Sequence, residues 1–226
     1  MRMRFSTTVF GGLVACAFLV TGFTGTARAQ SNVSVGITAG SPGIGAEIGV
    51  DVSDMLGLRV MGAYFPYSRT FTPDNVSYDG DLKLLSYGAV ADLYLFDSGF
   101  RLTGGAYLNR NRLDMKGTPN GAVTIGSTAY TPAQIGTLTG RVSFRDAAPY
   151  AGLGYASGRG ESGFAFTADA GVMFQGGPRV ALAASGPIAS APGFAANLEQ
   201  ERQKIASDID WLRFYPAVKV GVLYRF

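Results

Sequence analysis

Residues 215–226 read Tyr-Pro-Ala-Val-Lys-Val-Gly-Val-Leu-Tyr-Arg-Phe and alternate between two kinds of side chain. The residues that would form one face of an extended chain are apolar or aromatic: Val218, Val220, Val222, Tyr224 and Phe226. The opposite face would carry Ala217, Lys219, Gly221, Leu223 and Arg225. Alternation with period two indicates a β-strand between two different environments. An apolar face that ends in aromatic rings is typical of a strand that separates lipid from a polar lumen.

Seven segments upstream repeat this alternation. They are residues 33–39, 44–52, 58–67, 82–96, 100–111, 148–156 and 163–174. Along the chain, short links between segments alternate with long ones. The exception is the first link, residues 40–43, which is short although the alternation calls for a long link there. With eight strands, the other long links all fall at one end of a barrel, an asymmetry typical of transmembrane barrels. The sequence therefore predicts an all-β fold, an antiparallel up-and-down transmembrane β-barrel of eight strands.

Two regions between these segments leave the picture open. Residues 121–125 and 137–144 could pair as a hairpin above the membrane, or they could add two strands and give a barrel of ten. Residues 195–210 have apolar side chains at helix-like spacing with charged residues between them, which predicts a short amphipathic helix before the last strand.

The first residues are typical of a secretory signal peptide. Arg2 and Arg4 precede a short apolar stretch at 10–20, and the small-x-small tripeptide 27–29 predicts cleavage before Gln30. A lipoprotein signal ending at Cys16 is the alternative, although the apolar run continues past that cysteine. We therefore expect a signal peptide at 1–29 and one barrel domain at 30–226.

The charge balance of residues 30–226 argues against a nucleic-acid partner. The whole chain has a net charge of +3, and Arg2, Arg4 and Arg28 account for all of it. The processed chain would therefore be neutral, without the excess positive charge that attracts nucleic acid.

Eight charged residues occupy positions of the predicted strands whose side chains would point into the lumen. They are Glu47, Asp51, Arg59, Asp92, Arg101, Asp169, Lys219 and Arg225. These side chains could line a polar pore, or they could pair into a network that fills the barrel. The second interpretation is favoured because the signs balance, because buried charges persist only when paired, and because side chains fill an eight-stranded barrel. Proximity across the short turns suggests that Asp51 pairs with Arg59 and Asp92 with Arg101.

The absence of histidine limits the chemistry available. The chain has no histidine, and its one cysteine, Cys16, lies in the predicted signal peptide. Serine nucleophiles usually need a histidine base, and zinc sites rely on histidine or cysteine. Carboxylates at Asp74 and Asp79, or at Asp208 and Asp210, are better explained as solvated loop charges. We expect no enzyme activity, no cofactor and no metal site.

The eight segments, the signal and the ending Tyr224-Arg225-Phe226 together resemble the small outer-membrane β-barrel proteins of Gram-negative bacteria, the OmpA/OmpX/OmpW-like group. The ending is most similar to a sub-family without an assigned activity, whose last strand follows a charged helix. This resemblance implies export through the periplasm, a place in the outer membrane, and contact with membrane lipid and lipopolysaccharide. It also implies that the barrel-assembly machinery reads the last strand, with Tyr224 and Phe226 as the assembly signal.

The expected role is structural or one of surface interaction, with the lumen closed by the charge network. The alternative is a narrow channel for small solutes. In that case the glycines predicted to face the lumen would leave open space inside the barrel. They are Gly88, Gly105, Gly152 and Gly171.

Overall fold

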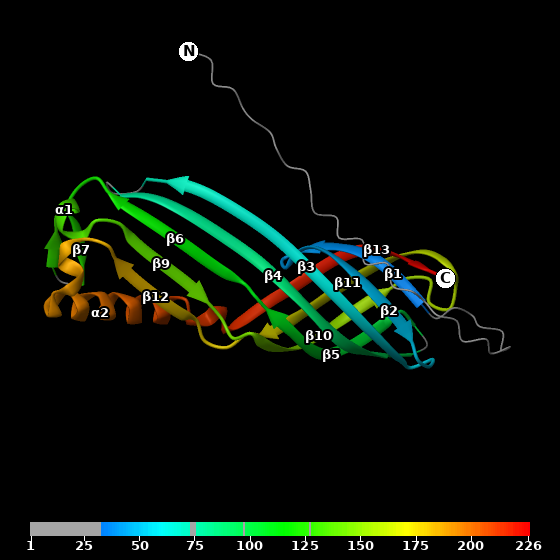
Figure 1. Ribbon diagram of the computed structural model, residues 1–226. Helices are drawn as coiled ribbons and strands as arrows, with labels where there is room; N and C mark the ends of the chain where they lie inside the picture. Colours follow the sequence, from blue (N-terminus) through cyan, green and yellow to red (C-terminus); the bar gives the residue numbers. More distant parts are fainter. Residues whose placement is uncertain (1–32, 73–75, 97, 127) are drawn as a thin grey trace, which may run out of the picture.

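The computed structural model describes residues 33–72, 76–96, 98–126 and 128–226 of the 226-residue chain. The predicted signal peptide at 1–29 lies outside the described residues. Figure 1 shows a strand barrel that continues at one end into a curved sheet, with a long helix beside that sheet.

Eight antiparallel strands form a closed ring. In ring order they are β1 (Val33–Gly40), β2 (Gly43–Asp51), β3 (Leu56–Phe71), β4 (Val76–Tyr94), β5 (Phe100–Asn109), β10 (Ala147–Ala156), β11 (Gly163–Phe174) and β13 (Phe214–Arg225). The ring closes where β13 pairs with β1, with Ile37 opposite Val222. The predicted eight-stranded, up-and-down barrel is confirmed, and the alternative of ten strands is wrong.

The side chains of the ring alternate between an exposed apolar face and a buried face. On β13 the outward Val218, Val220 and Val222 are each about half exposed, whereas the inward Lys219 is buried. No helix among the described residues has the length and hydrophobicity needed to span a bilayer.

A second sheet grows from the end of the barrel that carries the long loops, which we call the loop end. Residues 86–94 of β4 pair with β5, but residues 76–83 pair with β6 (Arg112–Pro119). β9 (Leu138–Ser143) then pairs with β6, and β12 (Arg179–Ala184) pairs with β9. We call this assembly of β6, β9 and β12 with the distal parts of β3 and β4 the outer sheet.

The outer sheet corrects the expectations for the third loop. Residues 121–125 and 137–144 do not pair with each other and add no strand to the ring. Instead β9 lies inside the outer sheet, and β7 (Val123–Ile125) pairs with the short β8 (Thr128–Tyr130). The prediction failed because one strand's alternation does not say which partner it pairs with.

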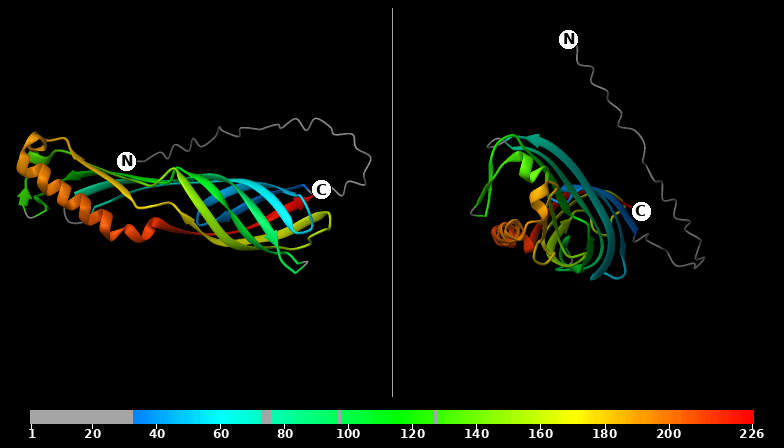
Figure 2. Two further views of the ribbon diagram at one scale, coloured as in Figure 1. Left: turned by 90° about the horizontal axis from the view of Figure 1, so that it is seen from below. Right: turned by 60° about the vertical axis from the view of Figure 1, so that its left-hand side comes forward.

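The predicted helix before the last strand is present as α2 (Pro192–Asp208), followed by the 3-10 turn η2 (Asp210–Arg213). α2 contacts β12 and β7 and runs along the outer sheet (Figure 2). Its first turn is anchored by the buried Phe194, which packs against Tyr130 with ring centroids 5.2 Å apart. The short helices α1 (Pro132–Ile135) and η1 (Pro187–Ser190) lie at the same end of the molecule.

The polarity of the outward face of β4 changes where the strand leaves the barrel. Its outward residues are apolar from Leu93 to Leu85 and become charged at Lys83, Asp81 and Asp79. A strand that passes from lipid into water is expected to change its outward side chains in this way. The reversal therefore places the outer boundary of the apolar belt between Leu85 and Lys83.

Candidate functional site: an ion network across the barrel

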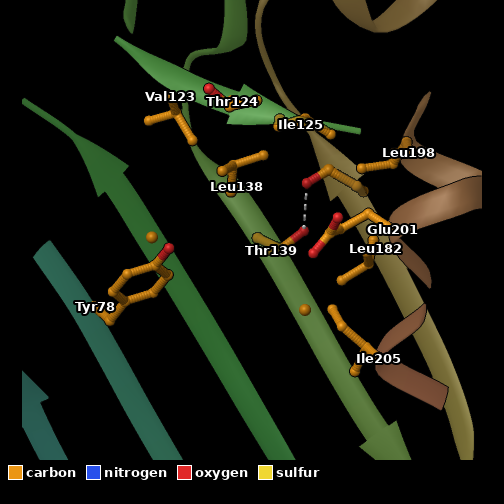
Figure 3. Close-up of a pocket in the computed structure, with 13 residues that line it drawn as sticks. Tyr78, Val123, Thr124, Ile125, Leu138, Thr139, Leu182, Leu198, Glu201 and Ile205 are labelled. Atoms are coloured by element: carbon orange, nitrogen blue, oxygen red, sulfur yellow. Dashed lines mark hydrogen bonds between the residues drawn. The ribbon is translucent and has the colours of Figure 1, made fainter. Parts of the chain in front are cut away.

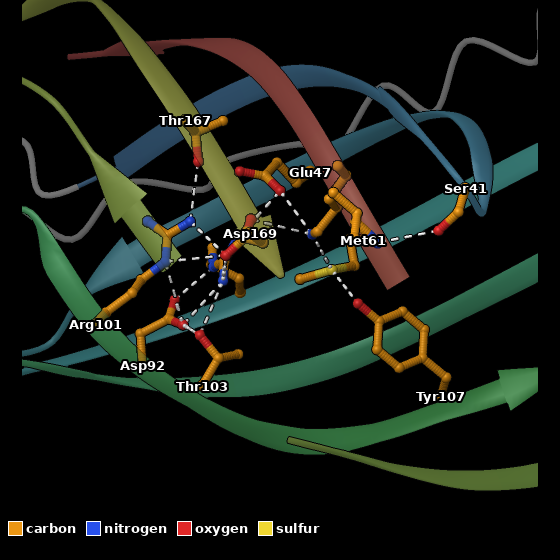
Figure 4. A network of polar contacts seen from close by, with 12 residues as sticks. Ser41, Glu47, Met61, Asp92, Arg101, Thr103, Tyr107, Thr167 and Asp169 are labelled. Atoms are coloured by element: carbon orange, nitrogen blue, oxygen red, sulfur yellow. Dashed lines mark hydrogen bonds and ion pairs between the residues drawn. The ribbon is translucent and has the colours of Figure 1, made fainter. Parts of the chain in front are cut away.

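Six of the eight charged residues predicted for the lumen meet inside the ring (Figure 4). They are Glu47 on β2, Arg59 on β3, Asp92 on β4, Arg101 on β5, Asp169 on β11 and Lys219 on β13. Six of the eight ring strands thus contribute one charge each.

Arg59 is the centre of the network. Its Nε and Nη2 atoms donate to the two carboxylate oxygens of Asp92, at 2.5 and 2.9 Å. The same guanidinium donates to Asp169 through Nη2 at 3.1 Å and to Glu47 through Nη1 at 3.3 Å. A guanidinium presents five donors in a planar fork, which is why one arginine holds three carboxylates here.

Arg101 links the same two aspartates from the neighbouring strand. Its Nη2 atom donates to Asp169 at 2.8 Å and to the hydroxyl of Thr167 at 2.9 Å. Its Nε atom lies 3.6 Å from Asp92, as the sequence suggested for this pair. Thr103 donates to Asp92 at 2.6 Å and supplies a further bond to that carboxylate.

Lys219 closes the network from β13. Its ammonium nitrogen lies 3.4 Å from Glu47 and 3.5 Å from Asp169. It also lies 3.0 Å from the sulfur of Met61, which in turn accepts a hydrogen bond from the hydroxyl of Tyr107 at 2.7 Å. The ion network therefore continues directly into the next layer of the barrel interior.

The network is neutral and shielded from solvent. It contains three carboxylates and three cations, and their exposed fractions run from 0% for Asp92 to 8% for Lys219. Buried charges are tolerated only when they are paired and hydrogen-bonded. Every member of this set has an oppositely charged partner within 4 Å.

The other two predicted residues lie apart, towards the end of the barrel with the short turns. Arg225 donates to the carbonyl oxygens of Ser157 and Gly158, both at 2.5 Å, and so caps the turn between β10 and β11. Within the described residues, Asp51 enters no ion pair, so the expected pair of Asp51 with Arg59 is wrong. Arg59 instead reaches Asp92 on the adjacent strand and Asp169 across the lumen.

The same end of the barrel is capped by an arginine that sequence reasoning did not single out. Arg159, in the turn between β10 and β11, places its guanidinium carbon 3.7 Å from the ring centre of Tyr94. Tyr94 is only 6% exposed. Because Tyr94 is two residues from Asp92 on the same face of β4, this cation–π contact lies next to the ion network, on the side of the short turns.

An apolar and aromatic layer lies inside the barrel on the loop-end side of the ions. It contains Val90, Tyr107, Ala148, Tyr150, Met173 and Ala217, with Met61 and Tyr215 packed against it. The rings of Tyr107 and Tyr150 pack edge to face with centroids 5.3 Å apart. This layer was not predicted from the sequence. The alternation of the strands does place the side chains of Tyr107 on β5 and Tyr150 on β10 on the inward face.

The lumen glycines make room for these rings. A Cβ atom on Gly152 or Gly171 would lie 2.5 or 2.4 Å from the hydroxyl oxygen of Tyr150. A Cβ atom on Gly88 would lie 2.8 Å from the ring of Tyr107, and one on Gly105 would lie 2.8 Å from the side chain of Val90. Side chains occupy the space beside these four glycines, which the channel interpretation expected to be open.

A pair of buried amides completes the interior at the loop end. Asn109 donates to the side-chain oxygen of Gln175 at 2.9 Å, and Gln175 donates to the carbonyl of Leu212 at 2.8 Å. Both side chains are at most 2% exposed. These bonds tie β5 to the segment that enters β13.

The described residues contain no group of three or more potential metal ligands of the His, Cys, Asp or Glu type. Of the loop carboxylates considered for catalysis, Asp79 accepts a hydrogen bond from Thr70 at 2.7 Å and Asp210 pairs with Arg213. Asp208 is exposed at the end of α2, and Asp74 lies outside the described residues.

Comparison with solved structures identifies the fold. CarO2 of Acinetobacter baumannii superposes with a TM-score of 0.57 at 21% sequence identity, covering 86% of this chain and 98% of its own. CarO of the same organism gives a TM-score of 0.56 at 20% identity, covering 85% and 97%. The fold is that of a small outer-membrane β-barrel. Ail of Yersinia pestis also matches, at 13% identity and a TM-score of 0.36, which is too distant to guide interpretation.

No protein-family model matches the sequence, and no curated protein matches it either.

Proposed function

We propose that this chain is an integral outer-membrane barrel whose lumen is closed, and that its role is structural or one of surface interaction at the outer sheet. The observation that carries the proposal is the contact between Arg59 and Asp169. Their strands, β3 and β11, are separated by three strands in either direction around the ring, yet their side chains meet at 3.1 Å.

Further support for a closed lumen comes from the layering of the interior. The neutral ion network, the layer around Tyr107 and Tyr150, and the Asn109–Gln175 pair follow one another along the barrel axis. Eight-stranded barrels have interiors just wide enough for side chains to fill. A transmembrane ion path would have to disrupt each of these layers.

Support for a surface role comes from the ionic face of the outer sheet. This face continues the lipid-facing side of β4 and carries ordered hydrogen bonds and ion pairs. They join Thr70 to Asp79, Ser68 to Asp81, and Asp114 to both Arg112 and Arg141. We propose that this ionic face contacts molecules outside the cell, including the head groups of lipopolysaccharide. The apolar belt, which on β4 runs from Leu85 to Leu93, then contacts the lipid chains.

The proposed assembly signal comprises Tyr224, on the outward face of β13, and Phe226, the residue that follows this strand. The rings of Tyr224 and Phe226 pack against each other with centroids 5.1 Å apart and remain 39% and 51% exposed. Rings exposed at the end of the last strand are available to the barrel-assembly machinery, which is the partner we propose for them. We propose neither a nucleic-acid partner nor an enzymatic role.

Planar-bilayer recordings test the closed lumen. We expect no conductance steps from the wild-type protein. Neutralising Lys219 or Asp92 serves as the comparison, because both residues lie in the network. Regular steps in wild type that change in these variants would contradict the proposal and support the alternative, a narrow channel for small solutes.

A further inference from the structure

Across β4, β6, β9 and β12, the inward face of the outer sheet is apolar, in contrast to its ionic outward face. The register aligns Tyr78, Gly117 and Leu138 across β4, β6 and β9. The row beside it aligns Gly80, Met115, Gly140 and Leu182 across β4, β6, β9 and β12. Side chains an even number of residues apart on a strand point to the same face of the sheet. Tyr78 and Asp92 are an even number apart on β4, so these rows lie on the face that continues the inside of the barrel.

A cavity of about 190 Å³ lies between this apolar face and α2 (Figure 3). Its lining is mostly hydrocarbon and comes from three directions. Tyr78, Leu138 and Leu182 come from the outer sheet, Ile125 comes from β7, and Leu198 and Ile205 come from α2.

Two glycines form part of the cavity floor. A Cβ atom on Gly117 would lie 2.9 Å from the ring of Tyr78, so this glycine lets the ring lie across β6. A Cβ atom on Gly140 would meet Leu182 at 3.4 Å and Met115 at 3.9 Å, which are ordinary contacts. A side chain at Gly140 would therefore fit the backbone and occupy cavity space.

One charged group lines this cavity. Glu201 lies between Leu198 and Ile205 at helical spacing, so it shares the face that α2 turns towards the sheet. Figure 3 shows its carboxylate beside Thr139 and Leu182. Glu201 makes no hydrogen bond or ion pair to the described part of the chain, whereas the nearby Glu199 is held by Arg202 and Gln203.

We propose that this cavity binds a small apolar amine, a molecule with one hydrocarbon ring or a short chain and a single ammonium group that pairs with Glu201. The size follows from the volume: an apolar cavity of about 150 Å³ accommodates benzene, whereas drug-sized ligands occupy about 300 Å³ or more. The charge follows from the unpaired carboxylate, since a half-buried anion gains most from a cationic donor.

This inference gives the proposed surface role a ligand, and it does not depend on a closed lumen. Conductance by the wild-type protein would contradict the closed lumen and would not affect the inference that the cavity binds an amine. A cavity that binds no amine would overturn the inference and leave the lumen untouched.

Calorimetric titration of the full protein in lipid nanodiscs tests the inference, with empty nanodiscs as the blank. The probes are 2-phenylethylamine, the neutral 2-phenylethanol and the anionic phenylacetate, which differ mainly in the polar group. We expect the amine to bind about tenfold more tightly than the alcohol, because hydrogen bonds to charged groups are stronger. Phenylacetate should not bind.

Three variants make the result specific to this site. Glu201→Gln should remove the preference for the amine over the alcohol. Gly140→Val should abolish binding of both by filling the cavity. Gly80→Val is the matched control, because it makes the same change in the same row, outside the cavity lining, where a Cβ atom has 3.6 Å or more of clearance. Gly80→Val should bind as wild type does.

Equal affinity for the amine and phenylacetate, or unchanged amine binding in Gly140→Val, would overturn the inference. Absence of binding by all three probes to the wild-type protein would overturn it as well.

Discussion

Arg59 and Asp169 lie on opposite walls of the barrel, and their side chains are joined by hydrogen bonds of 3.1 and 3.2 Å. One arginine thus connects β3 to β11 through the middle of the lumen, while it also holds Asp92 on the adjacent strand. The barrel is therefore cross-linked by ionic bonds within its interior as well as by the hydrogen bonds of its wall.

Removing one buried carboxylate should strongly destabilise the protein. Asp92 is fully buried and accepts hydrogen bonds from Arg59 and Thr103. We expect Asp92→Asn to lower the free energy of unfolding by about 3–5 kcal/mol, because it leaves excess positive charge in the interior. Urea unfolding in lipid vesicles measures this loss.

The matched control is Asp114→Asn on the outer sheet. Asp114 also pairs with two arginines, Arg112 and Arg141, but its side chain is 31% exposed. An exposed pair contributes at most about 1 kcal/mol, so this variant should unfold nearly as wild type does. Equal losses in the two variants would show that burial of the network has no energetic consequence.

The lumen glycines should not tolerate side chains. Gly152→Ala would place a methyl group 2.5 Å from the hydroxyl of Tyr150. We expect a loss of about 1–3 kcal/mol from overpacking. Tyr150→Phe in the same chain should recover only part of the loss, because the backbone oxygen of Ala170 would still lie 2.9 Å from the added methyl group. An alanine variant as stable as wild type would indicate open space at this position.

Deleting Phe226 should impair assembly into the membrane. Its backbone nitrogen donates to Val33 at 3.1 Å, and its ring packs on Tyr224. Heat-modifiable barrel in membrane fractions measures the effect. The control is Phe164→Ala, which removes another exposed ring that contacts Tyr224. Wild-type levels of folded barrel in the deletion would argue against the assembly signal.

The carboxyl group of Glu199 should titrate well below its ordinary range. Hydrogen bonds from Arg202, and then from Gln203, lower the pKa of Glu199 from 4.5 to about 2. A lowered pKa in the folded state means that this contact stabilises α2 above pH 4.5 and that the stabilisation is lost as the pH falls towards 2. Carbon NMR titration of the carboxyl group checks the value, and Arg202→Ala should raise it. An unchanged midpoint in that variant would contradict the assigned cause.

The strands of the barrel could be predicted because residues that face lipid must be apolar, which produces an alternation of apolar and polar residues along each strand. The segments at 33–39 and 163–174 match β1 and β11 closely for this reason. The pattern predicts a loop over the distal parts of β3 and β4, because the outward side chains become polar beyond Leu85 towards the loop end. Outside the membrane the same strands continue with the opposite polarity, so the requirement imposed by lipid no longer detects them.

The inward charges could be predicted from strand phase, but their partners could not. Sequence proximity suggested Asp51 for Arg59, since both residues flank one short turn. The side chain of Arg59 reaches Asp169 instead, 110 residues away in sequence. Such contacts depend on the curvature of the closed ring, which adjacent-strand reasoning does not contain.

The contact between opposite walls is tested most directly by a double-mutant cycle on Arg59→Met and Asp169→Leu, with the free energy of unfolding measured in lipid vesicles. If the two side chains meet across the lumen, the cycle gives a coupling energy above about 1 kcal/mol, as expected for residues in contact. If the two losses add to within about 0.5 kcal/mol, the side chains do not meet and the proposed closure of the barrel is contradicted.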